Sequence, residues 1–537
     1  MPTSNDSFST RLSQARQLQQ QGQLAEAEAL LQTLAQPDAD HYQQAGTALA
    51  EFYLQTGRPQ EAVDALVAVA DRYPDQLAPV ARLAYLLDVL GQTHAAVACY
   101  EQFVARQPDV ANAWFNLALA RRRDLQYPGA AEAYQAAIEL GVDDLAEAWT
   151  NLGVLYSEMR QPDQARASYE QALQHDDRYI PALFSLAGLA AGRGDADNAA
   201  ALYLQVLEID PKHADALARW SQLQEADADQ VDQRLIDAIN ASEDNGSREI
   251  LSYALGDRLD ARGYWPEAFD YLEQANILAQ QRHPPYQPEL TQRGIDSLIG
   301  VFTREWINEH SLESELAPIF LCGLPRSGLS LVEQMLQVHP AIDAGGEFDI
   351  LPWLVSRQLA PYPQRVLTAE REMLQAMADK YTNFVATLFP DADRVTDRRA
   401  DNFLHLGLLR ALFPSARFVY TRRDRRDNCL SIWSRKLDGN LLYADDLEHV
   451  MHYYHEHQRL MQHWLGLFPA AIHTVDYENL VSDPEPVLRR LLEFLGEPGV
   501  DECLAVYRDA GEPLHQRSVN RWQHYRERLP ASWDAKA

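Results

Sequence analysis

A segment with the spacing of a phosphate-binding loop begins at residue 318. It reads PIFLCGLPRSGLSLVEQMLQVHP, and the spacing G-x-x-x-x-G-K-[ST] is kept by Gly323, Gly328 and Ser330. Leu329 replaces the motif's lysine, which in nucleoside triphosphatases reaches the β- and γ-phosphates, while the final hydroxyl binds magnesium. Backbone amides and the helix dipole at a strand-to-helix loop bind an anion without that lysine. The segment therefore predicts a site for a ligand with one 5′-phosphate and no metal, with Arg326 as a nearby cation.

The elements around this loop alternate between strand and helix. Apolar runs predict strands at 319–324, 417–421 and 471–477, and helical patterns follow Gly328 and cover 403–413, 428–437 and 484–495, the last with Asp483 as N-cap and Gly496 as C-cap. Such alternation predicts a parallel α/β sheet. Ligands of these sheets bind at the carboxyl ends of the strands, where helix N-termini point.

The loop resembles the 5′-phosphosulfate loop of the sulfotransferases, whose pattern is P-[KR]-S-G-[ST]-[ST]. The matching residues are Pro325, Arg326, Ser327, Gly328, Leu329 and Ser330. Leu329 departs from the pattern and removes one hydroxyl donor. The resemblance implies 3′-phosphoadenosine 5′-phosphosulfate (PAPS) as co-substrate, with its 5′ end on these residues and no metal.

A second segment, RFVYTRRDRRDNCLSIW, is similar to the family's 3′-phosphate segment, R-x7-S across a strand-to-helix turn. Arg423 and Ser431 fit that spacing. A guanidinium and a hydroxyl near a helix N-terminus suit a terminal phosphate dianion. The alternative is a solvated turn rich in arginine and aspartate.

Two further matches extend the resemblance to about residues 317–528. VDYENLVSDPEPVLRRLLEFLG is similar to the family's Y-E-x-L-x-x-D-P, which implies that Tyr477 lies by the adenine. RSVNRWQHY resembles the C-terminal segment in which Arg521, with Ser518 as a second candidate, approaches the 3′-phosphate.

Sulfonate transfer needs a base for the acceptor's hydroxyl and cations for the charge on the leaving oxygen. Glu347 lies 21 residues after Arg326 and seven after Pro340, the placement of the catalytic glutamate in protein-tyrosine sulfotransferases. The alternatives are a surface glutamate after a glycine turn, and His405 as base, although His405 lies in an apolar run that predicts packing. The family's D-K-x-P-x-N-F becomes DRRADNF, so Arg398 replaces a lysine; Arg326 and Arg398 are the predicted cations.

The front of the chain repeats with a period near 34 residues, which predicts a helical solenoid. Tyr100, Tyr134, Tyr169 and Tyr203 follow this period, and WTNLGVLY at 149–156 resembles the tetratricopeptide consensus, with Ala165 and Tyr169 on its A-x3-F position. We expect about six units between residues 8 and 213. A degenerate helical hairpin follows at 251–281, and a proline-rich break at 281–288.

These patterns predict three segments: a tetratricopeptide solenoid at 1–285, a helical linker at 286–316 and a sulfotransferase domain at 317–537. The joined arrangement is similar to bacterial tetratricopeptide repeat-containing sulfotransferases. It predicts transfer of a sulfonate from PAPS to a hydroxyl, with a peptide or protein tyrosine as the expected acceptor, presented by the repeats. The alternative is a scaffold whose attached domain binds PAP or PAPS but transfers weakly; a P-loop kinase would need lysine at 329.

Charge and composition limit the partners. The net charge of −31 disfavours a nucleic-acid-binding role, because contact with phosphates needs a positive surface. The sequence contains no stretch of 18 apolar residues, so it predicts no membrane-spanning segment. The N-terminal segment has no apolar signal core, and four cysteines lack metal or disulfide spacing, which predicts a cytoplasmic protein. The sequence leaves the oligomeric state open.

Overall fold

The computed structural model describes residues 4–37, 39, 41–224, 226–314, 316–437, 441–499, 501, 503–504 and 518–534. They belong to two compact units, Met1–Asp195 and Ala196–Ala537. The division at residues 285 and 316 rests on sequence pattern and stays a prediction.

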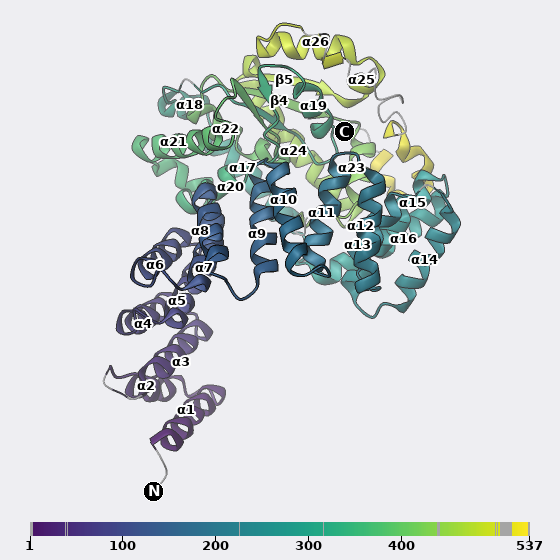
Figure 1. The fold of residues 1–537 in the computed structure, drawn as a ribbon. Helices are drawn as coiled ribbons and strands as arrows, with labels where there is room; N and C mark the ends of the chain where they lie inside the picture. The colour runs from purple at the N-terminus through teal and green to yellow at the C-terminus, as the bar shows by residue number, and fades with distance from the viewer. Residues whose placement is uncertain are drawn as a thin grey trace. The chain divides into compact units, whose positions relative to one another are not determined.

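The first unit is a series of antiparallel helices (Figure 1). Its elements are α1 (Ser4–Gln20), α2 (Leu24–Leu34), α3 (Tyr42–Gln55), α4 (Pro59–Arg72), α5 (Leu77–Val89), α6 (Thr93–Arg106), α7 (Ala111–Arg123), α8 (Tyr127–Glu139), α9 (Leu145–Glu158), α10 (Pro162–His175) and α11 (Ile180–Gly192). Gly22, Gly57 and Gly91 occupy the turns inside the first three pairs with positive φ, a conformation that glycine adopts without strain.

The α9–α10 pair shows why the repeat needs a glycine. A Cβ built on Gly153 would lie 2.5 Å from Cε1 of Tyr169 and 3.1 Å from the Ala165 carbonyl oxygen. The Tyr169 hydroxyl lies 3.2 Å from Ser157 Oγ. The missing side chain therefore lets two helices approach until the tyrosine ring fills the space between them.

Helices also begin the second unit. They are α12 (Ala196–Ile209), α13 (Ala214–Gln222), α14 (Ala228–Ala241), α15 (Asn245–Ala261), α16 (Trp265–Arg282), α17 (Pro288–Val301) and α18 (Arg304–His310). The hairpin predicted at 251–281 is confirmed as α15 and α16, with Gly263 in the turn at φ +82°. It is longer at its N-terminal end than predicted, because Asp244 caps α15 by accepting from Ser247 N.

A five-stranded parallel sheet in the order β2–β3–β1–β4–β5 forms the rest of the second unit, as the alternating pattern predicts. The strands are β1 (Ile319–Cys322), β2 (Ile342–Asp343), β3 (Arg394–Asp397), β4 (Arg417–Arg422) and β5 (Ile472–Asp476). The apolar runs predict β1, β4 and β5 but neither β2 nor β3. β2 has only two residues, and β3, although as long as β1, carries the polar sequence RVTD, which lacks an apolar run.

Helices cover both faces of the sheet. They are α19 (Leu329–Leu336), α20 (Ile350–Gln358), α21 (Arg371–Leu388), α22 (Leu406–Leu412), α23 (Arg425–Trp433), α24 (Leu447–Leu467), α25 (Tyr477–Ser482) and α26 (Pro484–Leu495), with 3₁₀ turns η1 (Gln364–Thr368), η2 (Ala400–Leu404), η3 (Pro469–Ala471), η5 (Arg521–Arg528) and η6 (Ala531–Asp534). The helix predicted at 403–413 is therefore divided between η2 and α22. Among the described residues, no helix is long and apolar enough to cross a bilayer.

Successive strand residues point to opposite faces, which sorts the core into two layers. Ile319 and Leu321 of β1 pack with α19, α25 and α26. Phe320 turns to the other face, where its ring centroid lies 5.8 Å from those of Phe418 and Tyr381. Both layers hold the strands in place, so the loops at their carboxyl ends have fixed supports.

Candidate active site

The loop between β1 and α19 is fastened to the end of β4. Ser327 Oγ donates to the Leu324 carbonyl at 2.6 Å and lies 2.6 Å from Thr421 Oγ1. A Cβ on Gly323 would meet the Thr421 carbonyl oxygen at 2.6 Å. The glycine and the buried hydroxyl pair thus allow the loop to lie directly against β4.

Arg326 lies at the tip of this loop, in a left-handed conformation with φ +67°. Its Nε lies 3.3 Å from Ser431 Oγ on α23, and Arg423 Nη1 donates to its carbonyl at 3.0 Å. The structure therefore brings together Arg326, Arg423 and Ser431, although Arg326 is separated from the other two by a long stretch of sequence. β1 and β4 are adjacent and parallel, so the loops that follow them meet at one edge of the sheet.

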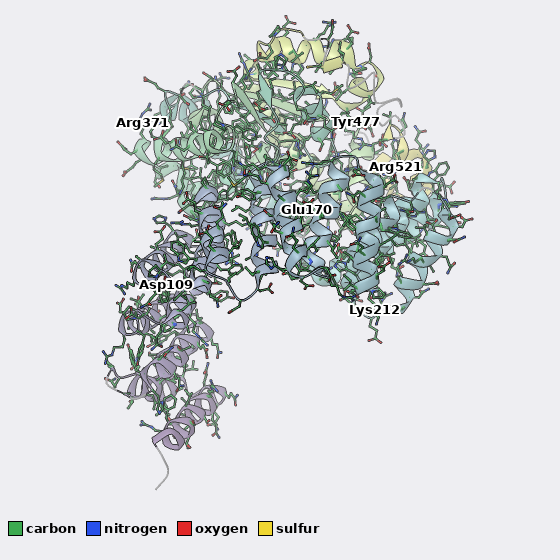
Figure 2. The ribbon with its side chains drawn as sticks, viewed as in Figure 1. Asp109, Glu170, Lys212, Arg371, Tyr477 and Arg521 are labelled. Carbon is green, nitrogen blue, oxygen red and sulfur yellow. The ribbon has the colours of Figure 1, made fainter. Side chains whose placement is uncertain are left out.

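Gly328 and Tyr477 pack against each other at the start of α19. Gly328 has φ +107°, and a Cβ there would lie 2.8 Å from Tyr477 Cδ2. The Arg423 guanidinium carbon lies 4.8 Å from the centre of the same ring, within the range of a cation–π contact. Tyr477 therefore contacts both the glycine and the arginine. Figure 2 labels Tyr477 and Arg521 on the second unit.

The other three loop residues have distinct environments. Pro325 accepts from Asn428 Nδ2 through its carbonyl at 2.8 Å. Leu329 is buried in the apolar layer of α19, α25 and α26, so its side chain fills the core and leaves its backbone as the part facing the loop. Ser330 Oγ accepts from Arg398 Nη1 at 2.9 Å.

Arg398 and Glu347 form an ion pair with 3.1 Å between Nη1 and Oε1. The Glu347 side chain keeps 55% of its surface exposed, whereas that of Arg398 keeps 22%. Arg398 also donates from Nε to Glu333 Oε2 at 2.6 Å. One guanidinium thus connects the predicted base, the first turn of α19 and a buried carboxylate.

Glu333 is a site residue that the sequence does not reveal. Its Oε1 accepts from Gly346 N at 3.0 Å and from Thr396 Oγ1 at 2.7 Å, while Oε2 binds Arg398. It thereby joins α19, β3 and the glycine turn before Glu347. In sequence it is a glutamate on an amphipathic helix, which predicts solvent exposure, and no pattern in the sequence pairs it with Arg398.

A buried carboxylate ends β3. Asp397 accepts from Tyr381 OH at 3.0 Å and from Asn402 Nδ2 at 3.1 Å. Burial raises its pKa to about 7, although hydrogen bonds from Asn402 and Tyr381 oppose the rise. Asp397 supports the turn that carries Arg398.

His405, the alternative base, is buried. Its Nδ1 has no hydrogen-bond partner among the described residues, and its ring packs 5.1 Å from that of Tyr362. Burial lowers its pKa to about 4. The prediction that His405 is a packed residue is therefore confirmed.

The C-terminal segment returns to this edge of the sheet. Asp427 at the start of α23 accepts from Asn520 N at 2.6 Å and from Trp522 N at 2.9 Å. Ser518 accepts from Arg423 Nη2 through its carbonyl at 2.6 Å. Arg521, between these anchors, donates from Nη1 to Ser434 Oγ at 3.3 Å. Arg517, the first residue of the RSVNRWQHY match, lies outside the described residues.

Four arginines repel one another at this edge. Burial, followed by the charges of Arg435 and Arg423, lowers the pKa of Arg326. Arg521 adds to the same repulsion. Burial also lowers the pKa of Arg423, whose Nε has no partner among the described residues. Concentrated, partly desolvated positive charge with unused donors suits a multiply charged anion.

The comparisons with known proteins define the class of each part. Residues 318–502 match the model of the sulfotransferase family, and residues 18–87, 82–144, 146–179 and 180–213 match tetratricopeptide repeat models. The chain therefore carries tetratricopeptide repeats followed by a sulfotransferase-family domain, and both resemblances drawn from the sequence are confirmed.

The relatives are distant. The chain is 26% identical over 387 residues to an uncharacterized protein of Aquifex aeolicus, covering 67% of this chain and 50% of that protein. It is 28% identical over 210 residues to the protein-tyrosine sulfotransferase of Drosophila melanogaster, covering 36% and 41%. The chain thus spans about half the length of these relatives.

Among solved structures, MamA is 25% identical, covers 31% of this chain and 96% of its own, and has a TM-score of 0.28.

Proposed function

We propose that this protein transfers a sulfonate from PAPS to a hydroxyl acceptor, with a tyrosine of a peptide or protein as the expected acceptor. The observation that carries the proposal is the convergence of Arg326, Arg423 and Ser431 at one edge of the sheet. Glu347 is linked to the same loop because Arg398 binds both Glu347 and Ser330.

The loop residues fit a nucleotide with phosphate groups at both ends. Gly328 packs directly against the Tyr477 ring, and the backbone at Leu329 and Ser330 begins a helix whose N-terminus favours an anion. Arg423 Nε is a buried donor with no hydrogen-bond partner among the described residues. Pro325 to Ser330 would hold the 5′ end, Arg423, Ser431 and Arg521 the 3′-phosphate, and Tyr477 would lie near the adenine.

When bound, PAPS supplies an activated sulfonate and leaves as PAP (3′,5′-adenosine diphosphate). Glu347 takes the proton of the acceptor hydroxyl while the oxygen of that hydroxyl forms the new bond to sulfur. The bond between sulfur and the bridging phosphate oxygen breaks, and Arg326 and Arg398 stabilise the charge on that oxygen. The exposure of Glu347 allows a large acceptor to reach it.

The relatives named protein-tyrosine sulfotransferase favour tyrosine as acceptor. Repeat arrays of this kind offer extended concave surfaces for partners, so we assign presentation of the acceptor to the repeats. Cys99, Cys322 and Cys429 are free thiols, which supports a reducing compartment and hence a cytoplasmic location.

A scaffold that binds PAP or PAPS but transfers weakly is the second candidate. Two observations favour this candidate. The Leu329 side chain lies in the core and offers no hydroxyl, and the Glu347 carboxylate is already ion-paired with Arg398. The first removes a donor to the phosphosulfate, and the second holds the base in a pair that an acceptor must displace.

The test compares the full chain with Glu347→Gln, using radiolabelled PAPS and a panel of tyrosine peptides and glycans. We expect transfer to tyrosine peptides, and loss of at least about 100-fold in the variant, the scale of a general base. Calorimetric titration with PAP should give the same affinity for both proteins. PAP binding without transfer to any acceptor would favour the scaffold, and no PAP binding would reject both candidates.

A further inference from the structure

Helix α15 brings two carboxylates to the arginines of the candidate active site. Asp260 Oδ1 accepts from Arg521 Nε at 3.0 Å and also from the Tyr525 hydroxyl. One turn earlier, Asp257 is ion-paired with Arg435. Both carboxylates lie outside residues 318–502, the segment that matches the sulfotransferase family.

The hairpin of α15 and α16 is attached to the sheet-containing part of the unit by specific contacts. Asn276 Nδ2 on α16 donates to the Trp433 carbonyl at 3.1 Å, and the Phe269 ring centroid lies 4.8 Å from that of Trp433. Trp433 ends α23, the helix that carries Ser431. These two contacts hold α16, the helix paired with α15, against the end of α23.

Two nitrogens of the Arg521 guanidinium are hydrogen-bonded, and the third has no partner among the described residues. Its side chain is 12% exposed, its Nε binds Asp260, and its Nη1 binds Ser434. Its Nη2 is buried and has no hydrogen-bond partner among the described residues. A buried unpaired donor costs about 1–3 kcal/mol, so a guanidinium anchored in this way favours a ligand that offers an oxygen.

Asp257 balances the charge of the same cluster. It interacts with Arg435, Arg521 and Arg326, and its Oδ1 is buried without a partner among the described residues. Burial raises the pKa of Asp257 to about 6, with Arg435 and Arg521 opposing the rise and Asp260 adding to it. Asp257 therefore offsets part of the positive charge of this arginine cluster.

We infer that α15 is part of the nucleotide site, and that Asp260 is a positioning residue which holds Arg521 for the 3′-phosphate of PAP or PAPS. This inference rests on the proposed function and deepens it. It adds α15, which precedes the strands in the sequence, to a site otherwise built from the loops around the sheet. Asp260 acts through Arg521 and does not touch the ligand.

The test measures binding of PAP and of adenosine 5′-monophosphate, which lacks the 3′-phosphate, to the full chain by calorimetry. We expect Asp260→Asn to weaken PAP about tenfold and to leave the monophosphate unchanged. Asp260→Glu should restore part of the PAP affinity. Asp270→Asn is the matched control, because Asp270 on α16 also binds the C-terminal segment, at 2.6 Å from Arg528 Nη2, but through a different arginine.

A double-mutant cycle separates positioning from general docking. If Asp260 acts through Arg521, the double variant Asp260→Asn with Arg521→Lys should bind PAP no more weakly than Arg521→Lys alone. Unchanged or tighter PAP binding by Asp260→Asn, equal losses in Asp260→Asn and Asp270→Asn, or simply additive losses in the cycle would overturn the inference. Failure of the unsubstituted chain to bind PAP would instead reject the proposed function.

Discussion

Arg398 Nη1 lies 3.1 Å from Glu347 Oε1, while Nε of the same guanidinium binds the buried Glu333. The sequence places an arginine where the sulfotransferase pattern has lysine, and the structure shows what the planar fork adds. Its nitrogens reach two carboxylates and the Ser330 hydroxyl, which a single ammonium cannot do in the same geometry. The candidate base is thus oriented by a residue on the turn that follows β3.

Glu333→Gln should lower turnover more than nucleotide affinity. Glutamine keeps an acceptor for Gly346 N but loses the charge that holds Arg398. Charge-assisted hydrogen bonds contribute about 1.5–3 kcal/mol, so we expect kcat to fall about tenfold or more with PAP affinity unchanged. Steady-state kinetics and PAP titration check this. An equal fall in both quantities would mean that Glu333 supports the whole loop.

Arg423→Lys should weaken PAP binding about tenfold, because lysine keeps the charge but not the fork. Arg423 donates from two nitrogens, to the Arg326 and Ser518 carbonyls, and lies over Tyr477. The neighbouring Arg422→Lys is the control, because Arg422 is half exposed and pairs with Asp476 at 2.7 Å. Equal affinities for the two variants in calorimetric titration would remove Arg423 from the nucleotide site.

Gly328→Ala should reduce PAP affinity by steric displacement. The new Cβ would lie 2.8 Å from Tyr477 Cδ2 and force the loop or the ring to move. Gly496→Ala controls for backbone strain, since Gly496 also has a positive φ, +80°, but no atom lies within 4 Å of the position that its Cβ would take. We expect both variants to lose thermal stability and Gly328→Ala alone to lose PAP affinity. Wild-type affinity in Gly328→Ala would show that the loop tolerates the methyl group.

Gly153→Ala should destabilise the first unit. The added Cβ would overlap the Tyr169 ring between α9 and α10, and overpacking of this kind costs about 1–3 kcal/mol. Gly192→Ala, at the end of α11 with no atom within 4 Å, should be neutral or stabilising. Thermal unfolding followed by circular dichroism compares them. Equal midpoints would show that the α9–α10 pair can open without loss.

Asp397→Asn should change the pH dependence of stability. Burial raises the pKa of Asp397 from 3.8 to about 7, so between these values the folded chain holds a proton that the unfolded chain has released. This residue's contribution to the free energy of unfolding therefore falls as pH rises from about 4 to 7. Asparagine does not ionise, so the unfolding midpoint of the variant should rise relative to that of the wild type as pH increases across that range. A pH-independent difference between the two midpoints would contradict the raised pKa.

Local and periodic features of the sequence were enough to predict the repeats, the strands with apolar runs, and the order of strand, loop and helix at Gly323–Ser330, while both family resemblances rest on matches to known motifs. Glycine positions, helix caps and apolar spacing encode such features directly, because each acts over a few neighbouring residues. The missed strand β2 has only two residues and the missed strand β3 is polar, so their pairing depends on neighbouring strands rather than on their own composition.

Which side chains meet at the site depended instead on tertiary packing. The parallel arrangement of β1 and β4 brings Arg326 to Ser431, and the packing of α19 beside β3 brings Glu333 to Arg398. The approach of α15 to Arg521 joins residues 261 positions apart. Such contacts result from packing whole elements against one another, and residue spacing within one segment carries no information about them.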